Sequence, residues 1–314
     1  MFAARCVGVS LAVFILLYVF LSLAASRTWK WLFRIFRPHS ARSAADLLFV
    51  FRILPVGLSS VFTLAVTVPS FLLLEPHSTD EAIGAVPTTL GLCCLILLAA
   101  GCIRAIAAQR RTSQAIAHWL NGSTVMESGG AVPVFRTGKD APTFTVAGVC
   151  TPRVLVSEAA VATLTSSELR AALRHEMTHA RRYDNLKKLL FRFVVFPGMS
   201  KLESAWSEHT EMAADDAAVS CFRDALDLAA ALIKVSRLGP LESAELTTAL
   251  LHSSTALSAR IRRLFTWGHV QEPATHNRNW LYMLPAATGT TICLIATYGS
   301  MLTRMHTVTE WLVR

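Results

Sequence analysis

The sequence predicts an α-helical membrane protein with an α+β domain inserted between its third and fourth membrane spans. Hydrophobic residues make up 53% of the 314 residues and charged residues only 16%, a composition more typical of membrane proteins than of soluble ones. The apolar residues gather in four long runs, whereas residues 109–279 have a globular composition. We therefore expect a three-span region over 1–108, the inserted domain over 109–279, and a last span with a short tail over 280–314.

The four apolar runs are each close to the roughly 20 residues that a helix needs to cross a bilayer. They lie at about 7–25, 53–74, 83–103 and 280–302. The first run could instead be a cleaved signal peptide that ends at "LAAS". Its length and the strongly basic segment after it favour a span, because the apolar core of a signal peptide has only about 7–15 residues.

The charges beside these runs predict how the protein is oriented. The segment between the first two runs is basic, whereas the segment between the second and third runs has acidic residues and no Lys or Arg. The positive-inside rule then places the first loop and the inserted domain in the cytosol, with the N-terminus outside the inner membrane. Within that first loop, "WKWLFRIF" mixes aromatic residues with cations and predicts an amphipathic segment along the membrane surface.

The net charge of +9 does not indicate nucleic-acid binding, because the basic residues adjoin the apolar runs and no aromatic-and-basic motif accompanies them. The seven cysteines show no CxxC spacing. This pattern disfavours both a disulfide framework and a thiolate metal site, so we expect reduced thiols.

The inserted domain begins with β-prone runs and then becomes helical. "STVMES", "VPVFR", "TFTVAG" and "RVLVS" are separated by turn residues and predict a small antiparallel sheet. Either of the last two runs could be an edge strand that holds an extended peptide, and an ordinary paired strand is an equally good interpretation. A long helix follows, with Thr165 and Glu168 in capping-box spacing and an end at Pro197. A second helix is predicted over 201–221.

The long helix contains "LRHEMTHARRYDN", in which two histidines are four residues apart. His175 and His179 therefore project from one helix face, where both imidazoles could reach a single metal ion. Glu176 is adjacent to His175, so its carboxylate could take a proton from a water molecule activated by zinc. The sequence therefore predicts one zinc ion and a general base on this helix.

The next helix offers the remaining ligand in "EHTEMAADDAAVS". Glu211 and Asp215 are one turn apart and face the same way, so Glu211 could bind the metal while Asp215 accepts a hydrogen bond from a ligand histidine. Two residues are candidates for stabilising an oxyanion, Tyr183 and His209. A structural aromatic and an ordinary helix histidine are the competing interpretations of these two.

Together, "LRHEMTHARRYDNLKKLL" and "EMAADDAAV" resemble the BlaR/MecR-type membrane metallopeptidases, which are bacterial antirepressor peptidases. The preceding "CTPRVLVSEAAVATLTSSELRAALRHE" and the later "ALSARIRRLF" are similar to that family as well. The resemblance covers about residues 120–266 and the four-span layout. It implies a zincin-like, gluzincin-type domain facing the cytosol, with zinc bound by His175, His179 and Glu211, Glu176 as general base and Asp215 orienting a ligand.

The resemblance also implies a substrate, either a transcriptional repressor or the enzyme itself. The sequence departs from the family in two places. It ends about a dozen residues after the last run, so we expect no C-terminal penicillin-binding sensor, and "FPGMSKLESAW" between the two metal helices differs from the usual linker. Two alternatives stay open: a quality-control or prenyl-type membrane protease, and a signalling scaffold that contains zinc but cleaves nothing.

Overall fold

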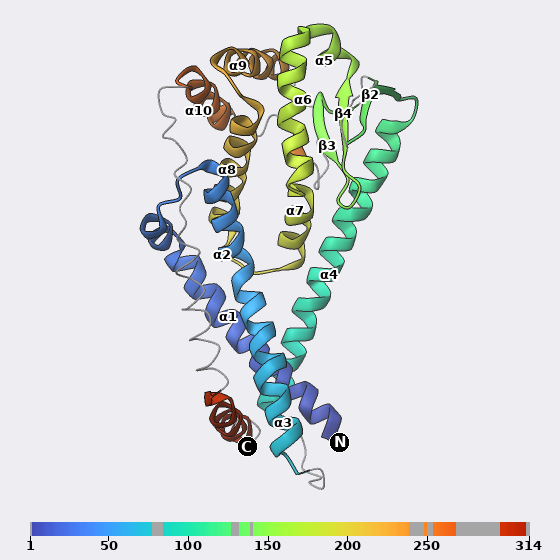
Figure 1. Ribbon diagram of the computed structural model, residues 1–314. Helices are drawn as coiled ribbons and strands as arrows, with labels where there is room; N and C mark the ends of the chain where they lie inside the picture. The colour runs from blue at the N-terminus through green and yellow to red at the C-terminus, as the bar shows by residue number, and fades with distance from the viewer. Residues whose placement is uncertain are drawn as a thin grey trace. The chain divides into compact units, whose positions relative to one another are not determined.

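The structure is a computed structural model that describes residues 2–76, 84–126, 132–138, 141–238, 248–249, 254–267 and 296–311. It is mostly helical, with one small sheet (Figure 1). The chain divides into two compact units. The first comprises residues 1–31, 51–100 and 273–314, and the second comprises residues 32–50 and 101–272.

Three helical stretches are long and apolar enough to cross a membrane, which confirms the prediction of a membrane protein in its coarse form. They are α1 (Phe2–Phe36), the continuous stretch Ala41–Leu74, and α4 (Ala85–Leu120). The middle stretch consists of α2 (Ala41–Phe62), a π-helical turn over Thr63–Thr67, and α3 (Val68–Leu74). Most of the fourth predicted span, residues 280–295, lies outside the described residues.

All three helical stretches extend beyond their predicted spans. The first apolar run and the basic segment after it form one helix to residue 36, and α4 continues for more than four turns beyond residue 103. The reason is that "IRAIAAQRRTSQAIAHWL" consists mainly of good helix formers, with no Gly or Pro to end the helix. The apolar length of a span therefore sets a minimum for its helix.

In the first unit, a helix over residues 296–311 packs against the middle stretch. Ser70 donates a hydrogen bond from Oγ to the carbonyl of Leu302 over 2.8 Å, and the Tyr298 hydroxyl donates to the carbonyl of Ala65 over 2.7 Å. These bonds give both hydroxyl groups a partner, as helices that could cross a membrane require.

The sheet of the second unit is mixed, so the prediction of an antiparallel sheet was wrong. Its strand order is β1-β2-β4-β3-β5. β3 and β4 form a hairpin, and β2 pairs in parallel with the other edge of β4. The strands are β1 (Thr124–Met126), β2 (Val134–Thr137), β3 (Phe144–Ala147), β4 (Arg153–Ser157) and β5 (Thr248–Ala249).

Neither of the two suggested edge strands is an edge. β4 lies between β2 and β3, and β3 pairs on its other side with β5 through Thr145 and Val146. β5, which covers the outer edge of β3, lies about a hundred residues further along the chain. Local β-propensity does not reveal such a distant pairing.

In the described part of the second unit, six helices follow the hairpin, and α6 is central among them. Figure 1 shows α6 lying between the sheet and the group formed by α8, α9 and α10. The helices are α5 (Glu158–Thr163), α6 (Ser166–Arg181), α7 (Asp184–Phe193), α8 (Ser200–Ala218), α9 (Phe222–Arg237) and α10 (Ser254–Phe265).

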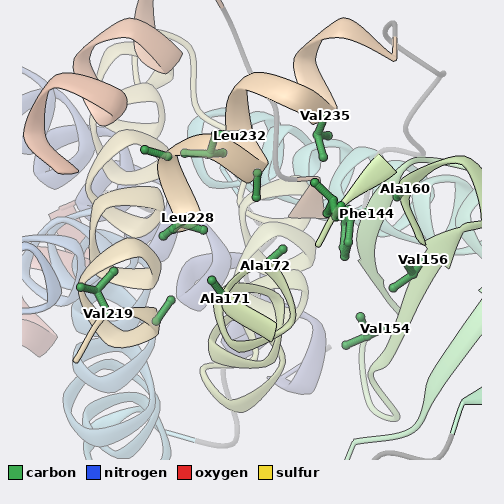
Figure 2. Close-up of a cluster of buried hydrophobic side chains, with 14 of the residues drawn as sticks. Phe144, Val154, Val156, Ala160, Ala171, Ala172, Val219, Leu228, Leu232 and Val235 are labelled. Carbon is green, nitrogen blue, oxygen red and sulfur yellow. The ribbon is translucent and has the colours of Figure 1, made fainter. Parts of the chain in front are cut away.

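The hydrophobic core of the second unit joins the sheet to these helices (Figure 2). Phe144 and Val156 from the strands pack toward the small residues Ala171 and Ala172 of α6, and Leu228 of α9 closes the cluster. Alanines on α6 let its neighbours approach closely, which fixes the helix that carries the histidines.

One close helix approach in the second unit depends on a glycine. A Cβ at Gly101 on α4 would overlap the backbone carbonyl of Phe193 at the end of α7. We expect Gly101→Ala to reduce the free energy of unfolding by about 1–3 kcal/mol, because overpacking forces the backbone to move. Thermal unfolding of the purified protein measures this, with Gly57→Ala as control, since nothing lies within 4 Å of a Cβ there. Equal melting temperatures for the two variants would contradict the assigned contact.

Candidate metal centre

The helix that carries the two histidines begins with the predicted capping box. The Thr165 hydroxyl accepts a hydrogen bond from the backbone N–H of Glu168 over 3.3 Å, and the Glu168 carboxylate accepts one from the backbone N–H of Thr165 over 2.8 Å. Lys234 of α9 donates to the same carboxylate over 2.8 Å. Burial alone would raise the pKa of Glu168. The Lys234 ammonium and the hydrogen bond from the Thr165 backbone N–H prevail and hold that pKa below its usual range. The capping box therefore fixes where α6 begins, and the contact between Lys234 and Glu168 ties α9 to that end of α6.

Both histidines are buried and face each other. His175 is 0% exposed and His179 is 1% exposed, and their Nε2 atoms lie 3.1 Å apart. The spacing of four residues places them one helical turn apart on the same face, as the sequence predicted.

The other nitrogen of each ring lies against a carboxylate. His175 Nδ1 is 3.0 Å from Asp215 Oδ1, and His179 Nδ1 is 2.8 Å from Asp184 Oδ2. Burial raises the pKa of both carboxyl groups, but contacts with Arg260 at Asp215 and with His179 at Asp184 prevail and lower it. An ionised carboxylate can only accept, so His179 Nδ1 donates to Asp184 and His179 Nε2 presents a lone pair, whereas His175 Nδ1 lies close to Asp215 without hydrogen-bond geometry.

The two Nε2 atoms lie 3.1 Å apart, so either a proton or a metal ion can be held between them. Burial alone would lower the pKa of His175, but its contacts with Asp215 and Glu211 prevail and raise that pKa to about 9. The pocket thus favours positive charge at this position. A divalent metal ion supplies that charge with both imidazoles neutral.

Glu211 of α8 completes a triangle of potential ligand atoms. Glu211 Oε2 lies 3.5 Å from His175 Nε2, and Glu211 Oε1 lies 3.6 Å from His179 Nε2. Zinc bonds to nitrogen and oxygen ligands of about 2.0–2.2 Å give tetrahedral edges of about 3.3–3.6 Å. The two distances from Glu211 fall in this range and the 3.1 Å between the two Nε2 atoms is slightly shorter, so His175, His179 and Glu211 could together hold a metal ion.

Glu176 lies beside this triangle and is completely buried. Neither of its carboxylate oxygens has a hydrogen-bond partner among the described residues. Burial raises its pKa, although the two histidines act in the opposite direction. Buried polar atoms without partners are rare in folded proteins and commonly mark a site that acts on a ligand.

Arg260 of α10 contacts the two α8 carboxylates of the site, those of Glu211 and Asp215. Its Nε and Nη2 donate to the two oxygens of Asp215 over 2.7 and 2.6 Å, and its Nη1 lies 3.0 Å from Glu211 Oε2. Together with His179, this guanidinium holds the pKa of Glu211 well below its usual range although burial opposes it. Glu211 is thus ionised, as a metal ligand must be.

A break in the helix brings Asp184 to the site. The sequence predicts one helix through to Pro197, but α6 ends at Arg181, and Tyr183 has a left-handed φ of 52°. This turn ends α6 and starts α7 at Asp184, whose carboxylate lies against His179. Asn185 then donates through Nδ2 to the carbonyls of Val146 and Gly148 over 2.9 and 3.1 Å, which ties α7 to β3.

Three residues of the site were missed as site residues by the sequence analysis: Asp184, Arg260 and Lys188. Asp184 also lies 3.1 Å from Lys187. Lys188 has its pKa lowered by burial, while Glu211, Asp184 and Glu176 act in the opposite direction. The only sequence signal for Arg260 was its place in the basic "ALSARIRRLF".

The two suggested oxyanion donors lie elsewhere. Tyr183 is 52% exposed, because the break in the helix removes it from the face of His179. His209 is on the face of α8 opposite to Glu211, and its ring packs against Phe33 with centroids 5.4 Å apart. Neither side chain has a described contact with the metal-ligand candidates.

Comparisons with known proteins give no further assignment. No family model matches the chain, and no curated protein matches it.

The carboxylates behind the histidines should control metal affinity. We expect Asp184→Asn to weaken zinc binding by about 10–100-fold, because the histidine would lose a charged acceptor that fixes its orientation. Competition titration with a zinc-sensitive dye measures the affinity. The control is Asp224→Asn, which removes a carboxylate that pairs with Arg174 at the surface over 2.9 Å. If Asp184→Asn and Asp224→Asn bind zinc equally well, Asp184 does not support a ligand.

Proposed function

We propose that this protein is a zinc-dependent membrane endopeptidase of the BlaR/MecR type. The observation that carries the proposal is the triangle of His175, His179 and Glu211 beside the buried, unbonded carboxylate of Glu176. The two imidazoles and one carboxylate form a common ligand set of catalytic zinc in peptidases, which keeps a position open for water or substrate. The helical arrangement around them is compatible with a zincin-like, gluzincin-type domain.

One bound zinc ion would polarise the scissile carbonyl and lower the pKa of water to near neutrality. The side chains of the protein supply the other parts of the reaction. Glu176 removes a proton from the attacking water and then delivers that proton to the leaving amine. Its raised pKa suits this role, because a carboxylate with a pKa nearer to neutrality both accepts and releases protons efficiently.

The surrounding residues keep these groups in place. Asp184 and Asp215 hold the two imidazoles through their Nδ1 atoms, so that both Nε2 atoms point to the metal position. Arg260 fixes Asp215 and Glu211 relative to each other. A site held in this way requires little rearrangement during the reaction.

Family resemblance and the charge pattern supply the rest of the proposal. The enzyme would lie in the inner membrane with its catalytic domain in the cytosol, where its substrate would be a transcriptional repressor or the enzyme itself. A quality-control or prenyl-type protease remains the alternative among the membrane proteases with these motifs.

A zinc-containing scaffold that cleaves nothing is the main rival outside the enzymes. Glu176 argues against it. A purely structural metal site has no use for an additional buried carboxylate without a hydrogen bond, which carries a considerable desolvation cost.

Hydrolysis that depends on zinc tests the proposal. The full chain, purified in detergent, would be incubated with a peptide library from denatured proteins, and new termini would be identified by mass spectrometry. We expect cleavage to stop on treatment with a zinc chelator and to return when zinc is restored. Cleavage that persists in the metal-free protein, or zinc-loaded protein that never cleaves a peptide or itself, would contradict the proposed activity.

A further inference from the structure

A cavity of about 930 Å³ opens in the second unit, away from the metal centre. It lies among the end of α1, the start of α2, and one face each of α8 and α10. Pockets that bind small molecules commonly have volumes of about 300–1,000 Å³. The cavity is therefore large enough for a ligand headgroup.

The cavity and the metal centre use different residues of the same helices. His209, Met212 and Asp216 line the cavity from α8, whereas Glu211 and Asp215 of that helix lie at the metal centre. On α10, Arg263 lines the cavity and Arg260 faces the carboxylates of the metal centre. A ligand here would not touch the groups that we propose for peptide hydrolysis, so the cavity is not a subsite beside the metal.

The electrostatics of the cavity favour an anion. Arg34 and Arg37 line it and are exposed, and neither has an ion-pair partner among the described residues. Asp216 is the only acid among the described residues that line it, and Arg263 neutralises that carboxylate through contacts of 2.6 and 2.7 Å. A net positive lining remains.

The start of α2 adds to this positive potential. Ser40 and Ala41 line the cavity, and the Ser40 hydroxyl caps the helix by accepting from the backbone N–H of Ser43 over 3.1 Å. The positive end of the helix dipole is therefore directed toward the cavity. Arg37 has a left-handed φ of 38°, and this turn ends α1 and lets the chain enter α2 beside the cavity.

The position of the arginines on α1 indicates the source of the anion. Arg34 is nine residues after Ala25, the end of the apolar run, which is about 13 Å along a helix. Trp31, Ile35 and Phe36 on the same stretch are 61%, 54% and 59% exposed. Exposed aromatic and aliphatic side chains among cations are typical of a segment at the headgroup level of a bilayer.

We propose that this cavity binds the phosphate headgroup of an anionic phospholipid. Arg34 and Arg37 contact the phosphate from α1, and the start of α2 presents its positive end. The less polar walls formed by Phe33, Met212 and Trp267 pack against the glycerol part of the headgroup. Free phosphate has the same charge chemistry, but it lacks the apolar portion that would occupy these walls.

Lipid retention in detergent tests the proposal, because dilute lipid in micelles produces little of the surface potential of a bilayer. The full chain would be titrated with phosphatidylglycerol or phosphatidylcholine, and bound lipid counted by native mass spectrometry. We expect one phosphatidylglycerol to bind at least tenfold more tightly than phosphatidylcholine. Arg34→Gln together with Arg37→Gln should remove most of this preference, and His39→Glu, at the cavity wall, should weaken it through repulsion.

The matched control is Arg27→Gln together with Lys30→Gln. It removes the same charge from the same helix, but at residues that do not line the cavity. We expect this control to change the affinity by less than about threefold, since it leaves every cavity contact intact. Equal losses for both pairs, or no preference for phosphatidylglycerol, would overturn the proposal. Displacement of the lipid by millimolar inorganic phosphate would overturn the assignment to a lipid.

Discussion

Glu176→Gln should abolish peptide hydrolysis while zinc binding is retained. The amide keeps the size of the side chain but cannot accept the proton of the attacking water, so we expect the rate to fall by at least about 10²–10⁴-fold. Zinc binding should persist, because His175, His179 and Glu211 are unchanged. The measurement pairs the turnover of a cleaved peptide with the zinc content of the same preparation.

The matched control is Glu208→Gln. This residue lies on α8, the helix of Glu211, but its carboxylate is exposed and is not part of the site. It should retain nearly full activity. If a zinc-loaded Glu176→Gln protein cleaved as rapidly as the wild type, Glu176 would not be the general base. If that variant lost its zinc, Glu176 would instead be a ligand.

Arg260→Met should be the most destabilising single substitution at the site. It leaves two buried carboxylates, Asp215 and Glu211, without the guanidinium that contacts both. Removal of one partner from a buried ion pair costs about 3–5 kcal/mol. For a domain of this size we expect the melting temperature to fall by about 6–20 °C.

Loss of helical circular dichroism on heating, in one detergent and at one zinc concentration, measures this effect. The control is Arg262→Met, two residues further along α10, where the side chain is exposed. Its melting temperature should stay close to that of the wild type, because isolated surface charges contribute little. Similar melting temperatures for Arg260→Met and Arg262→Met would show that the buried contacts of Arg260 contribute no net stability.

Local patterns predicted the parts of the site that lie close together in sequence. The spacing of His175 and His179 needs only helical geometry, and the capping box at Thr165 and Glu168 fixes where the helix begins. The same periodicity placed Glu211 and Asp215 on one face of α8, where both contact His175. The long apolar runs likewise predicted the helices that could cross a membrane.

The residues that sequence analysis missed depend on irregular backbone or on distant contacts. Asp184 reaches His179 only because Tyr183 adopts a left-handed conformation, which is uncommon for a residue other than glycine and has no clear sequence signal. Arg260 is 45 residues after Asp215, so its role depends on how α10 packs against α8. The parallel pairing of β2 with β4 and the occupation of the β3 edge by β5 are tertiary features too.

Zinc X-ray absorption spectroscopy on the purified full chain would show directly whether these residues bind zinc. We expect one zinc ion per chain with only nitrogen and oxygen ligands at about 2.0–2.2 Å, including the scattering pattern of two imidazoles. His175→Ala or His179→Ala should reduce that pattern to one imidazole or abolish zinc binding. A zinc–sulfur distance near 2.3 Å from any of the seven cysteines, or wild-type protein that binds no zinc, would contradict the account.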